Sequence, residues 1–447
     1  MRPSSSPPDR AAGLFDGVLA AGDVRAATGD AAWVRALLDA EAALARAAAR
    51  TGLAAGADAD AVVAACAGLV VDPGELGAEA AATGNPVVPL IRRLRAAVPG
   101  DAARLVHRGA TSQDIVDTAA MLVARRALEP LLADLGAAAG CAAALAREHR
   151  GTLVAGRTLL QQAVPTTFGL IAAGWLTGLD TARRRLAEVR DHRLAAQLGG
   201  AAGTLAAYAP DDGTGDAGVA MLAAYSAELG LAEPELPWHT ERTRIADLAT
   251  ALGTAAGAVA KVARDLVLFA QTEVGEVAEA GDAGGSSTLP HKHNPIRAIS
   301  AAAAAAQAPG LVATLLAAMA HEHQRAAGGW HAEWLPLRAL LRSTGSAAFQ
   351  LRAALECLRV DAARMRGNLD LTHGALLAER VAAALVPALG DRAHPVVRAA
   401  VARGDLAGDP AITARLDPAR LAALLAPDTY VGSAGALIDR ALRAAAR

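Results

Sequence analysis

One stretch near the middle of the chain carries an unusual density of side chains that can do chemistry. Residues 284–295 read Gly-Gly-Ser-Ser-Thr-Leu-Pro-His-Lys-His-Asn-Pro, with hydroxyl, imidazole, ammonium and amide groups in close succession. Pro290 and Pro295 stop a helix from running through, and the glycines permit the positive φ angles of a tight or closing loop. This composition predicts a loop that holds an anion against a proton-transfer group.

Two further polar inserts, at residues 107–118 and 156–167, interrupt the Ala/Leu/Val-rich sequence. In the first insert, Thr111, Ser112 or Asp114 can cap the helix that follows, and the free N–H groups of a helix start also attract carboxylates. Each insert contains hydroxyl, amide or cationic groups suited to carboxylates. Three unrelated loops are the alternative interpretation.

Other kinds of site have less support in the sequence. His291 and His293, like His321 and His323, are two residues apart, so neither pair shares a helix face. No carboxylate or cysteine stands at ligand spacing around the first pair, and we therefore expect no metal site. The glycine patterns that bind phosphates are missing, and no Ser-His-Asp order is readable.

The composition predicts an all-α protein. Hydrophobic residues make up 53% and aromatic residues 3% of the 447 residues, so the apolar content is mainly Ala, Leu and Val. Ala and Leu are the best helix formers. A formal net charge of −2 and the lack of basic runs give no reason to expect a nucleic-acid partner. No uninterrupted apolar stretch reaches a membrane-spanning length, and we expect subunit contacts to cover the extra apolar surface.

Helical spacing of the apolar residues divides the chain into domains. We expect a disordered Pro/Ser-rich tail at 1–12, an N-terminal helical domain at 13–105, a central bundle of long helices at 106–358 and a smaller C-terminal helical domain at 359–447. Within the bundle the pattern predicts long helices at 131–150, 166–191, 242–280 and 296–320.

The three inserts together resemble the three signature regions of the fumarase/aspartase superfamily, which includes adenylosuccinate and argininosuccinate lyases. Residues 285–295 are similar to the signature G-S-S-x-M-P-x-K-x-N-P, with Leu289 in place of the usual methionine. The segment 107–114 is similar to the first region, and the segment 156–165 to the second. The resemblance implies an all-α, fumarase/aspartase-like fold with a long central helical bundle.

Within the superfamily, the sequence most resembles the bacterial 3-carboxy-cis,cis-muconate cycloisomerases, through nearly the whole chain. The resemblance implies a cytoplasmic homotetramer that needs no metal or cofactor, binds a small polycarboxylate, and builds each active site from three subunits. It implies Ser286 and Lys292 as the catalytic residues. The substrate-binding residues that it implies are His107, Thr111, Ser112, Arg157, Thr158, Gln162, His239, Asn294 and Arg325.

One departure from the superfamily bears on the mechanism. Lyases that expel an amine or hydroxide usually have histidine after the threonine of the second region, where this chain has Leu159. Leucine cannot donate a proton, whereas a carboxylate leaving group is a stable anion near pH 7 and needs no general acid. We therefore expect an intramolecular lyase that converts 3-carboxy-cis,cis-muconate to 4-carboxymuconolactone in protocatechuate breakdown.

Three alternatives stay open at this point. An elimination lyase with a weakly basic leaving group, such as nitrite from a nitrosuccinate-type acid, is equally compatible with Leu159. An adenylosuccinate lyase-like activity fits less well, because Gly84-Asn85 replaces the histidine-bearing segment of those enzymes. A non-enzymatic helical scaffold gives no reason for so polar a loop at 284–295.

Overall fold

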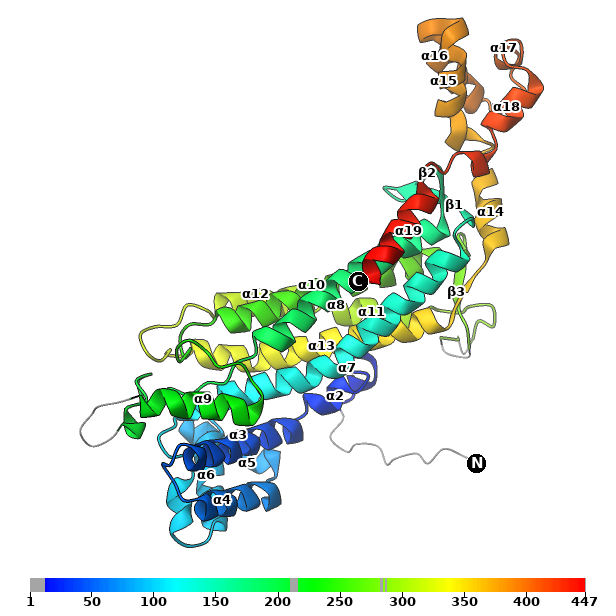
Figure 1. The fold of residues 1–447 in the computed structure, drawn as a ribbon. Helices are drawn as coiled ribbons and strands as arrows, with labels where there is room; N and C mark the ends of the chain where they lie inside the picture. The colour runs from blue at the N-terminus through cyan, green and yellow to red at the C-terminus, as the bar shows by residue number, and fades with distance from the viewer. Residues whose placement is uncertain (1–12, 210–215, 282–283, 286–287, 447) are drawn as a thin grey trace. The chain divides into compact units, whose positions relative to one another are not determined.

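The computed structural model describes residues 13–209, 216–281, 284–285 and 288–446. These residues are mainly helical, with two small antiparallel two-stranded sheets, and the predicted all-α class is confirmed (Figure 1). The predicted tail at 1–12 lies outside the described residues, as does Ser286.

The chain divides into two compact units. The first lies within Met1–Asp134, Ala182–Ala260 and Ser300–Gln350, and the second within Leu135–Thr181, Lys261–Ile299 and Leu351–Arg447. The division falls inside five helices, which are α7 (Ser112–Glu148), α8 (Phe168–His192), α10 (Thr243–Phe269), α11 (Ile296–Ala305) and α13 (Gly329–Glu356). The predicted domain boundaries near residues 105 and 358 stay predictions.

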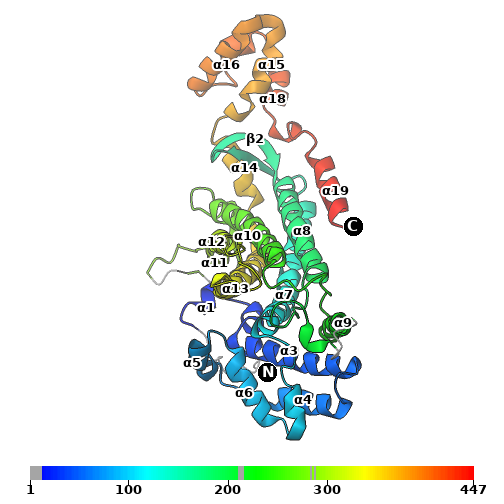
Figure 2. The ribbon, with the colours of Figure 1, turned by 90° about the vertical axis from the view of Figure 1, so that its left-hand side faces the viewer.

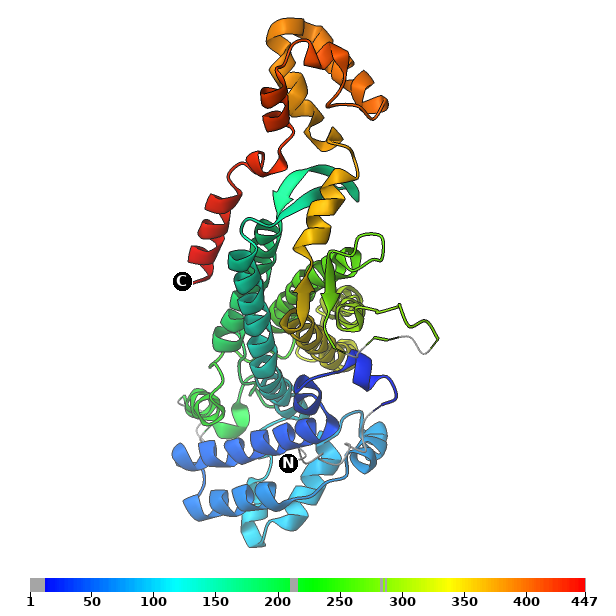
Figure 3. The same ribbon diagram turned by 90° about the vertical axis from the view of Figure 1, so that its right-hand side faces the viewer.

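In the first unit, α3 (Asp30–Arg50) packs against α4 (Gly56–Gly68) and α9 (Ala217–Leu229) (Figure 1, Figure 3). The buried residues of α3 are alanines and leucines apart from Glu41, and alanine lets neighbouring helices approach closely. The remaining elements before the first polar insert are α1 (Asp16–Leu19), α2 (Val24–Ala27), α5 (Pro73–Thr83), α6 (Val87–Ala97) and η1 (Gly100–Leu105).

In the second unit, the hairpin of β1 (Leu153–Thr158) and β2 (Gln161–Thr167) packs against α14 (Ala362–Asp370) (Figure 2). A second sheet pairs β3 (Val277–Glu279) with β4 (Leu358–Val360). A cluster of buried apolar residues lies within the C-terminal part of the chain. That cluster is built mainly from α15 (Ala378–Leu389), α16 (Ala393–Ala402), α17 (Pro410–Thr413) and α18 (Pro418–Leu424), and α19 (Ala434–Ala445) ends the chain.

Two predicted helices differ from the structure. The helix expected at 242–280 ends at Phe269, because the chain turns at Gly275, where φ is 61°, and continues as strand β3. The helix expected at 296–320 is interrupted between α11 and α12 (Ala308–Ala317). Pro309 lies in the first turn of α12, where its missing N–H does no harm but where it cannot continue the preceding helix.

Three stretches of the described chain are long and apolar enough, by length and composition, to cross a membrane: Ser112–Glu148, Thr243–Phe269 and Ile296–Ala317. The expectation concerned uninterrupted apolar runs, whereas each of these stretches also contains polar residues. Between 33% and 56% of the most apolar window in each is buried within the chain. Much of the apolar surface of these helices is therefore not covered by the chain itself.

Candidate active site

Helix α7 begins at the first polar insert, and its first turn contains a buried carboxylate. Oδ2 of Asp114 accepts a hydrogen bond from the backbone N–H of Thr111 at 2.9 Å. This contact is half of a capping box, in which the third helical residue bonds the backbone of the N-cap residue. Of the three residues expected to cap this helix, Asp114 does so through its side chain.

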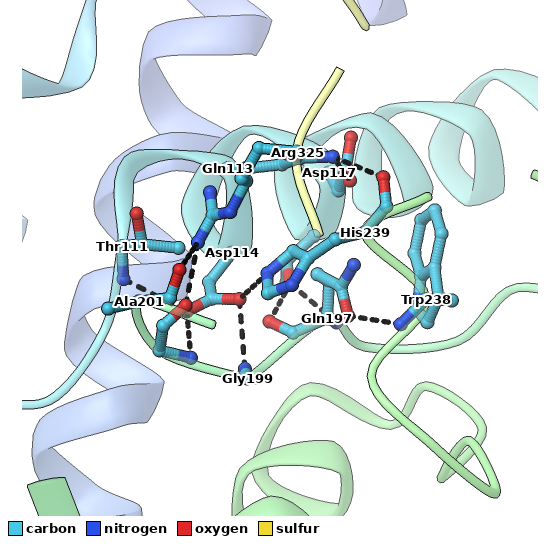
Figure 4. Close-up of polar contacts among 12 residues, drawn as sticks. Thr111, Gln113, Asp114, Asp117, Gln197, Gly199, Ala201, Trp238, His239 and Arg325 are labelled. Atoms are coloured by element: carbon cyan, nitrogen blue, oxygen red, sulfur yellow. Dashed lines mark hydrogen bonds and ion pairs between the residues drawn. The ribbon is translucent and has the colours of Figure 1, made fainter. Parts of the chain in front are cut away.

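Asp114 connects three segments that are distant in sequence (Figure 4). Its Oδ1 accepts from the N–H of Gly199 at 2.9 Å and lies 2.6 Å from Nε2 of His239, while Oδ2 accepts from the N–H of Gly200 at 3.0 Å. Gly199 admits no side chain, because a Cβ there would lie 2.6 Å from Cε1 of His239. These donors compensate the burial of a carboxylate, which would otherwise be strongly unfavourable.

A buried ion cluster lies next to Asp114, one helical turn along α7. The Arg242 guanidinium pairs with Asp117 at 2.8 Å and with Glu333 at 2.5 Å, and Nε1 of Trp330 donates to Asp117 at 3.0 Å. Burial works to lower the pKa of Arg242, but the two carboxylates raise it overall. Gln113 joins this cluster to the Asp114 network, because its Nε2 donates both to Asp117 and to the backbone carbonyl of His239.

Arg325 supplies a cation that is held by neutral acceptors. Its Nη2 donates to the backbone carbonyls of Gly200 at 2.6 Å and Ala201 at 3.2 Å, and its buried Nε has no partner among the described residues. Burial lowers the pKa of Arg325, against the opposing effect of Asp114 and Asp117. No carboxylate is paired directly with this guanidinium within the described chain, so its N–H groups can bind a substrate carboxylate.

His107 lies in the turn that leads into α7, in a left-handed backbone conformation with φ of 61°. Its Nδ1 lies 2.7 Å from Oε1 of Glu41, and 16% of its side chain is exposed. The structure therefore places five predicted substrate-binding residues in the first unit, around the start of α7 and the Asp114 network. These are His107, Thr111, Ser112, His239 and Arg325.

The predicted residues of the second insert lie in the second unit, on the β1–β2 hairpin. Arg157 forms a bidentate ion pair with the fully buried Glu276, at 2.9 and 2.7 Å. Nε2 of Gln162 donates to the backbone carbonyl of Asn368, whose own Nδ2 donates to Glu276. Thr158 is exposed at the end of β1. Both Arg157 and Gln162 thus bond protein acceptors here, and their contact with substrate stays a prediction.

Hydrogen bonds join the two ends of the signature loop. The backbone N–H and the side-chain Nδ2 of Asn294 both donate to the carbonyl of Gly284, at 3.0 and 2.9 Å. Gly284 has a φ of 85°, and a Cβ there would lie 2.1 Å from the backbone oxygen of Asn294. The Lys292 side chain is exposed. Ser286 and Ser287 lie outside the described residues, and the expected closure of this loop as a lid stays a prediction.

Three carboxylates that hold predicted site residues or cap a helix were not predicted from the sequence. Glu41 and Glu276 hold His107 and Arg157, and Glu279 accepts the N–H groups of Arg297 and Ala298 at the start of α11. The available signal was a carboxylate within an otherwise apolar pattern, as Glu41 is in α3. Among the residues that the structure describes, no three His, Cys, Asp or Glu side chains lie close enough to hold a metal ion.

Comparisons with known proteins agree on the family. The sequence matches the family described as "Lyase" over residues 17–310. A 3-carboxy-cis,cis-muconate cycloisomerase of Bradyrhizobium diazoefficiens is 45% identical over 444 residues, which cover 96% of this chain and 97% of that protein. A nitrosuccinate lyase of Streptomyces davaonensis is 46% identical over 450 residues, which cover 96% of this chain and 94% of that protein.

The fold is likewise similar to that of a solved structure. The 3-carboxy-cis,cis-muconate lactonizing enzyme of Pseudomonas putida aligns with a TM-score of 0.89 and 40% sequence identity, covering 97% of this chain and 99% of that one. The resemblance found in the three polar inserts therefore extends to the whole chain and to its fold. The chain belongs to the lyase family and is an enzyme of the fumarate lyase, or fumarase/aspartase, superfamily.

Proposed function

We propose that this enzyme converts 3-carboxy-cis,cis-muconate to 4-carboxymuconolactone. The proposal is supported by the similarity to a cycloisomerase over 96% of the chain and by the fold of a lactonizing enzyme. The start of α7 and Arg325 provide a helix N-terminus and a cation for the carboxylates of such a substrate.

The observation that carries the proposal is the apolar tip of the β1–β2 hairpin. Leu159 and Leu160 have φ angles of 51° and 63°, and their side chains are 97% and 70% exposed. Glycine or asparagine normally occupies such turns, and a left-handed conformation costs other residues about 1–2 kcal/mol each. Neither leucine can donate a proton, so a tip that reaches a substrate suits a leaving group that departs as a stable anion. This favours lactonisation and nitrite elimination alike over the loss of an amine or hydroxide.

The proposed reaction is an intramolecular addition. One substrate carboxylate attacks an alkene carbon, a C–O bond forms, and the π electrons move to the neighbouring carbon and into an adjacent carboxylate. In this proposal Lys292 and Asn294 of one subunit and the start of α7 at Ser112 of another subunit stabilise this aci-carboxylate. The Ser286 hydroxyl then protonates the carbon and regains its proton from solvent. Holding the reactive conformer contributes roughly 7–11 kcal/mol in well-oriented intramolecular reactions.

A second candidate function is the elimination of nitrite from a nitrosuccinate-type acid. A nitrosuccinate lyase is 46% identical to this chain, and nitrite is also a weak base that departs without a general acid. The same polar groups would then stabilise the carbanion formed next to a carboxylate of the succinate skeleton.

Assay of the purified enzyme on both substrates distinguishes the two functions. We expect rapid loss of the ultraviolet absorbance of the muconate diene and no appearance of fumarate from nitrosuccinate. An unchanged mass together with loss of the diene absorbance identifies the reaction as an isomerisation. Fumarate formation without loss of the diene would contradict the proposal and establish the second function.

We further propose that the enzyme is a cytoplasmic homotetramer whose active sites combine residues of different subunits. The long helices α7 and α10 have windows that are only 50% and 56% buried within the chain, and apolar surface of this kind is typical of subunit contacts. The exposed leucines of the hairpin tip likewise require cover. In this proposal neighbouring subunits cover the apolar surface of α7 and α10 and the leucines of the hairpin tip.

Burial of the hairpin tip in the assembly is testable with a cysteine probe. We expect Leu159→Cys to react with a thiol reagent at least about tenfold more slowly in the assembled protein than after denaturation, because a covered thiol is inaccessible to the reagent. Val70→Cys is the matched control, since Val70 is 93% exposed and apolar. Labelling is followed peptide by peptide by mass spectrometry. Equal reactivity of the two thiols in the assembled protein would show that no subunit covers the tip.

A further inference from the structure

We infer that Glu41 is a positioning residue of the active site and acts through His107. The inference rests on the proposed function, because it assumes that His107 contacts the polycarboxylate substrate. It adds to that function a residue of α3 that lies 66 positions away in sequence and outside all three signature regions.

Both oxygens of the Glu41 carboxylate contact the same residue, His107. Oε2 accepts the backbone N–H of His107 at 3.0 Å, and Oε1 lies 2.7 Å from its ring Nδ1. An ionised carboxylate can only accept hydrogen bonds, so the hydrogen on this side of the ring is on Nδ1. The second ring nitrogen, Nε2, is thereby left for another partner.

The location of Glu41 indicates that this contact is its role. It is 1% exposed and is the one charged residue among the buried residues of α3, which are otherwise alanine and leucine. Burying a carboxylate in such a helix face is unfavourable unless it is fully hydrogen-bonded. An apolar residue would serve the packing of α3 better, so the carboxylate serves His107.

The turn that carries His107 is fixed on its other side as well. The hydroxyl of Tyr208 donates to the backbone carbonyl of Arg108 at 2.8 Å. Gly109 packs so closely on Tyr208 that a Cβ would lie 2.5 Å from the ring. Because φ of His107 is 61°, the backbone is strained and needs such support. Glu41 therefore determines both the tautomer and the direction of the imidazole.

The chemical consequence concerns substrate binding. With Nδ1 bonded to Glu41, only Nε2 can reach a ligand, and in the imidazolium form it donates to a carboxylate. Without Glu41 the ring can rotate, and part of this contact is lost before the substrate arrives. Positioning of this kind acts on the bound ground state and the transition state alike, and therefore changes KM more than kcat.

The first test is Glu41→Gln, assayed on whichever of the two substrates the wild type converts. We expect KM to rise about 10- to 100-fold, the factor associated with a hydrogen bond to a charged group, while kcat changes less than about threefold. The same substitution in a His107→Ala background should then have no further effect on kcat/KM. An equal loss in that background would overturn the inference, because Glu41 would not be acting through His107.

Two substitutions of His107 test the inference even if Glu41→Gln does not fold. In His107→Asn the side-chain amide replaces Nδ1, so we expect wild-type thermal stability and a KM raised about 10-fold or more. In His107→Gln the amide reaches the position of Nε2, so we expect a smaller increase in KM and a lower melting temperature, because Oε1 of Glu41 loses its donor. The opposite pattern contradicts the inference.

The outcomes also separate this inference from the proposed function. If the wild type converts one of the two substrates and kcat/KM is unchanged in both His107 variants, the inference is overturned and the proposed function stays in place. Lack of turnover of both substrates by the wild type contradicts the proposed function, and the inference with it.

Discussion

Replacement of Ser286 by alanine is expected to lower kcat by about 10²–10⁴-fold, the usual contribution of a general acid or base. In the proposed reaction the Ser286 hydroxyl delivers the proton to the substrate carbon, and alanine has no proton to deliver. The fold and the assembly should be unchanged, because the substitution removes a single oxygen atom. Steady-state kinetics on the muconate substrate and light scattering of the purified variant measure the two effects.

The neighbouring Ser287 provides the matched control, since it has the same side chain in the same loop. We expect Ser287→Ala to retain at least about a tenth of the wild-type kcat. Near-normal activity of Ser286→Ala would remove this residue from its role. A loss confined to Ser287→Ala would move the role to that serine.

The second large effect is expected on stability, from Arg242→Met. This substitution leaves Asp117 and Glu333 buried without their shared cation, and breaking a buried pair in this way typically costs about 3–5 kcal/mol. We expect a corresponding decrease in the free energy of unfolding, measured by urea denaturation followed by circular dichroism. The Trp238 indole, which stacks 4.8 Å from the guanidinium, also loses a contact.

Lys261→Met, on helix α10, which begins directly after Arg242, is the control. Lys261 pairs with Asp265 one turn away on α10, but its side chain is 61% exposed, and exposed pairs of this kind contribute only about 0.3–0.5 kcal/mol. The two substitutions replace a cation by the same apolar residue and differ mainly in burial. Similar losses for both variants would show that the ion cluster around Arg242 has no special energetic role.

The loss in free energy of unfolding caused by Arg242→Met should also depend on pH. Burial raises the pKa of Glu333 above its ordinary value of 4.5, although Arg242 acts to lower it. A carboxyl whose pKa is raised by folding stays protonated to a higher pH in the folded state than in the unfolded state. It therefore lowers the free energy of unfolding progressively as the pH rises from 4.5 to the folded pKa. Loss of Arg242 extends this window upward. We therefore expect the variant to lose more stability near neutral pH than in mild acid.

Much of the architecture was predictable because it depends on local sequence. The apolar spacing in residues 166–191 predicted a helix that the structure shows as Phe168–His192, since burial of one face and high intrinsic propensity agree there. The polar stretch at 107–118 predicted a helix start, and α7 begins at Ser112. The end of α10 was predicted wrongly. The stop at Phe269 depends on a turn and on strand β3, whose partner β4 is about eighty residues away.

The sequence by itself determined the helical class, the three polar inserts and the family, because these follow from composition and from residues close together in the chain. Only the tertiary structure decided which buried charges meet. The pairs Glu41 with His107, Asp114 with His239, and Arg157 with Glu276 each join segments that are far apart in sequence. The reason is that a charge removed from water needs a partner nearby in space, and the packing of the helices, not their order in the chain, determines which residue that is.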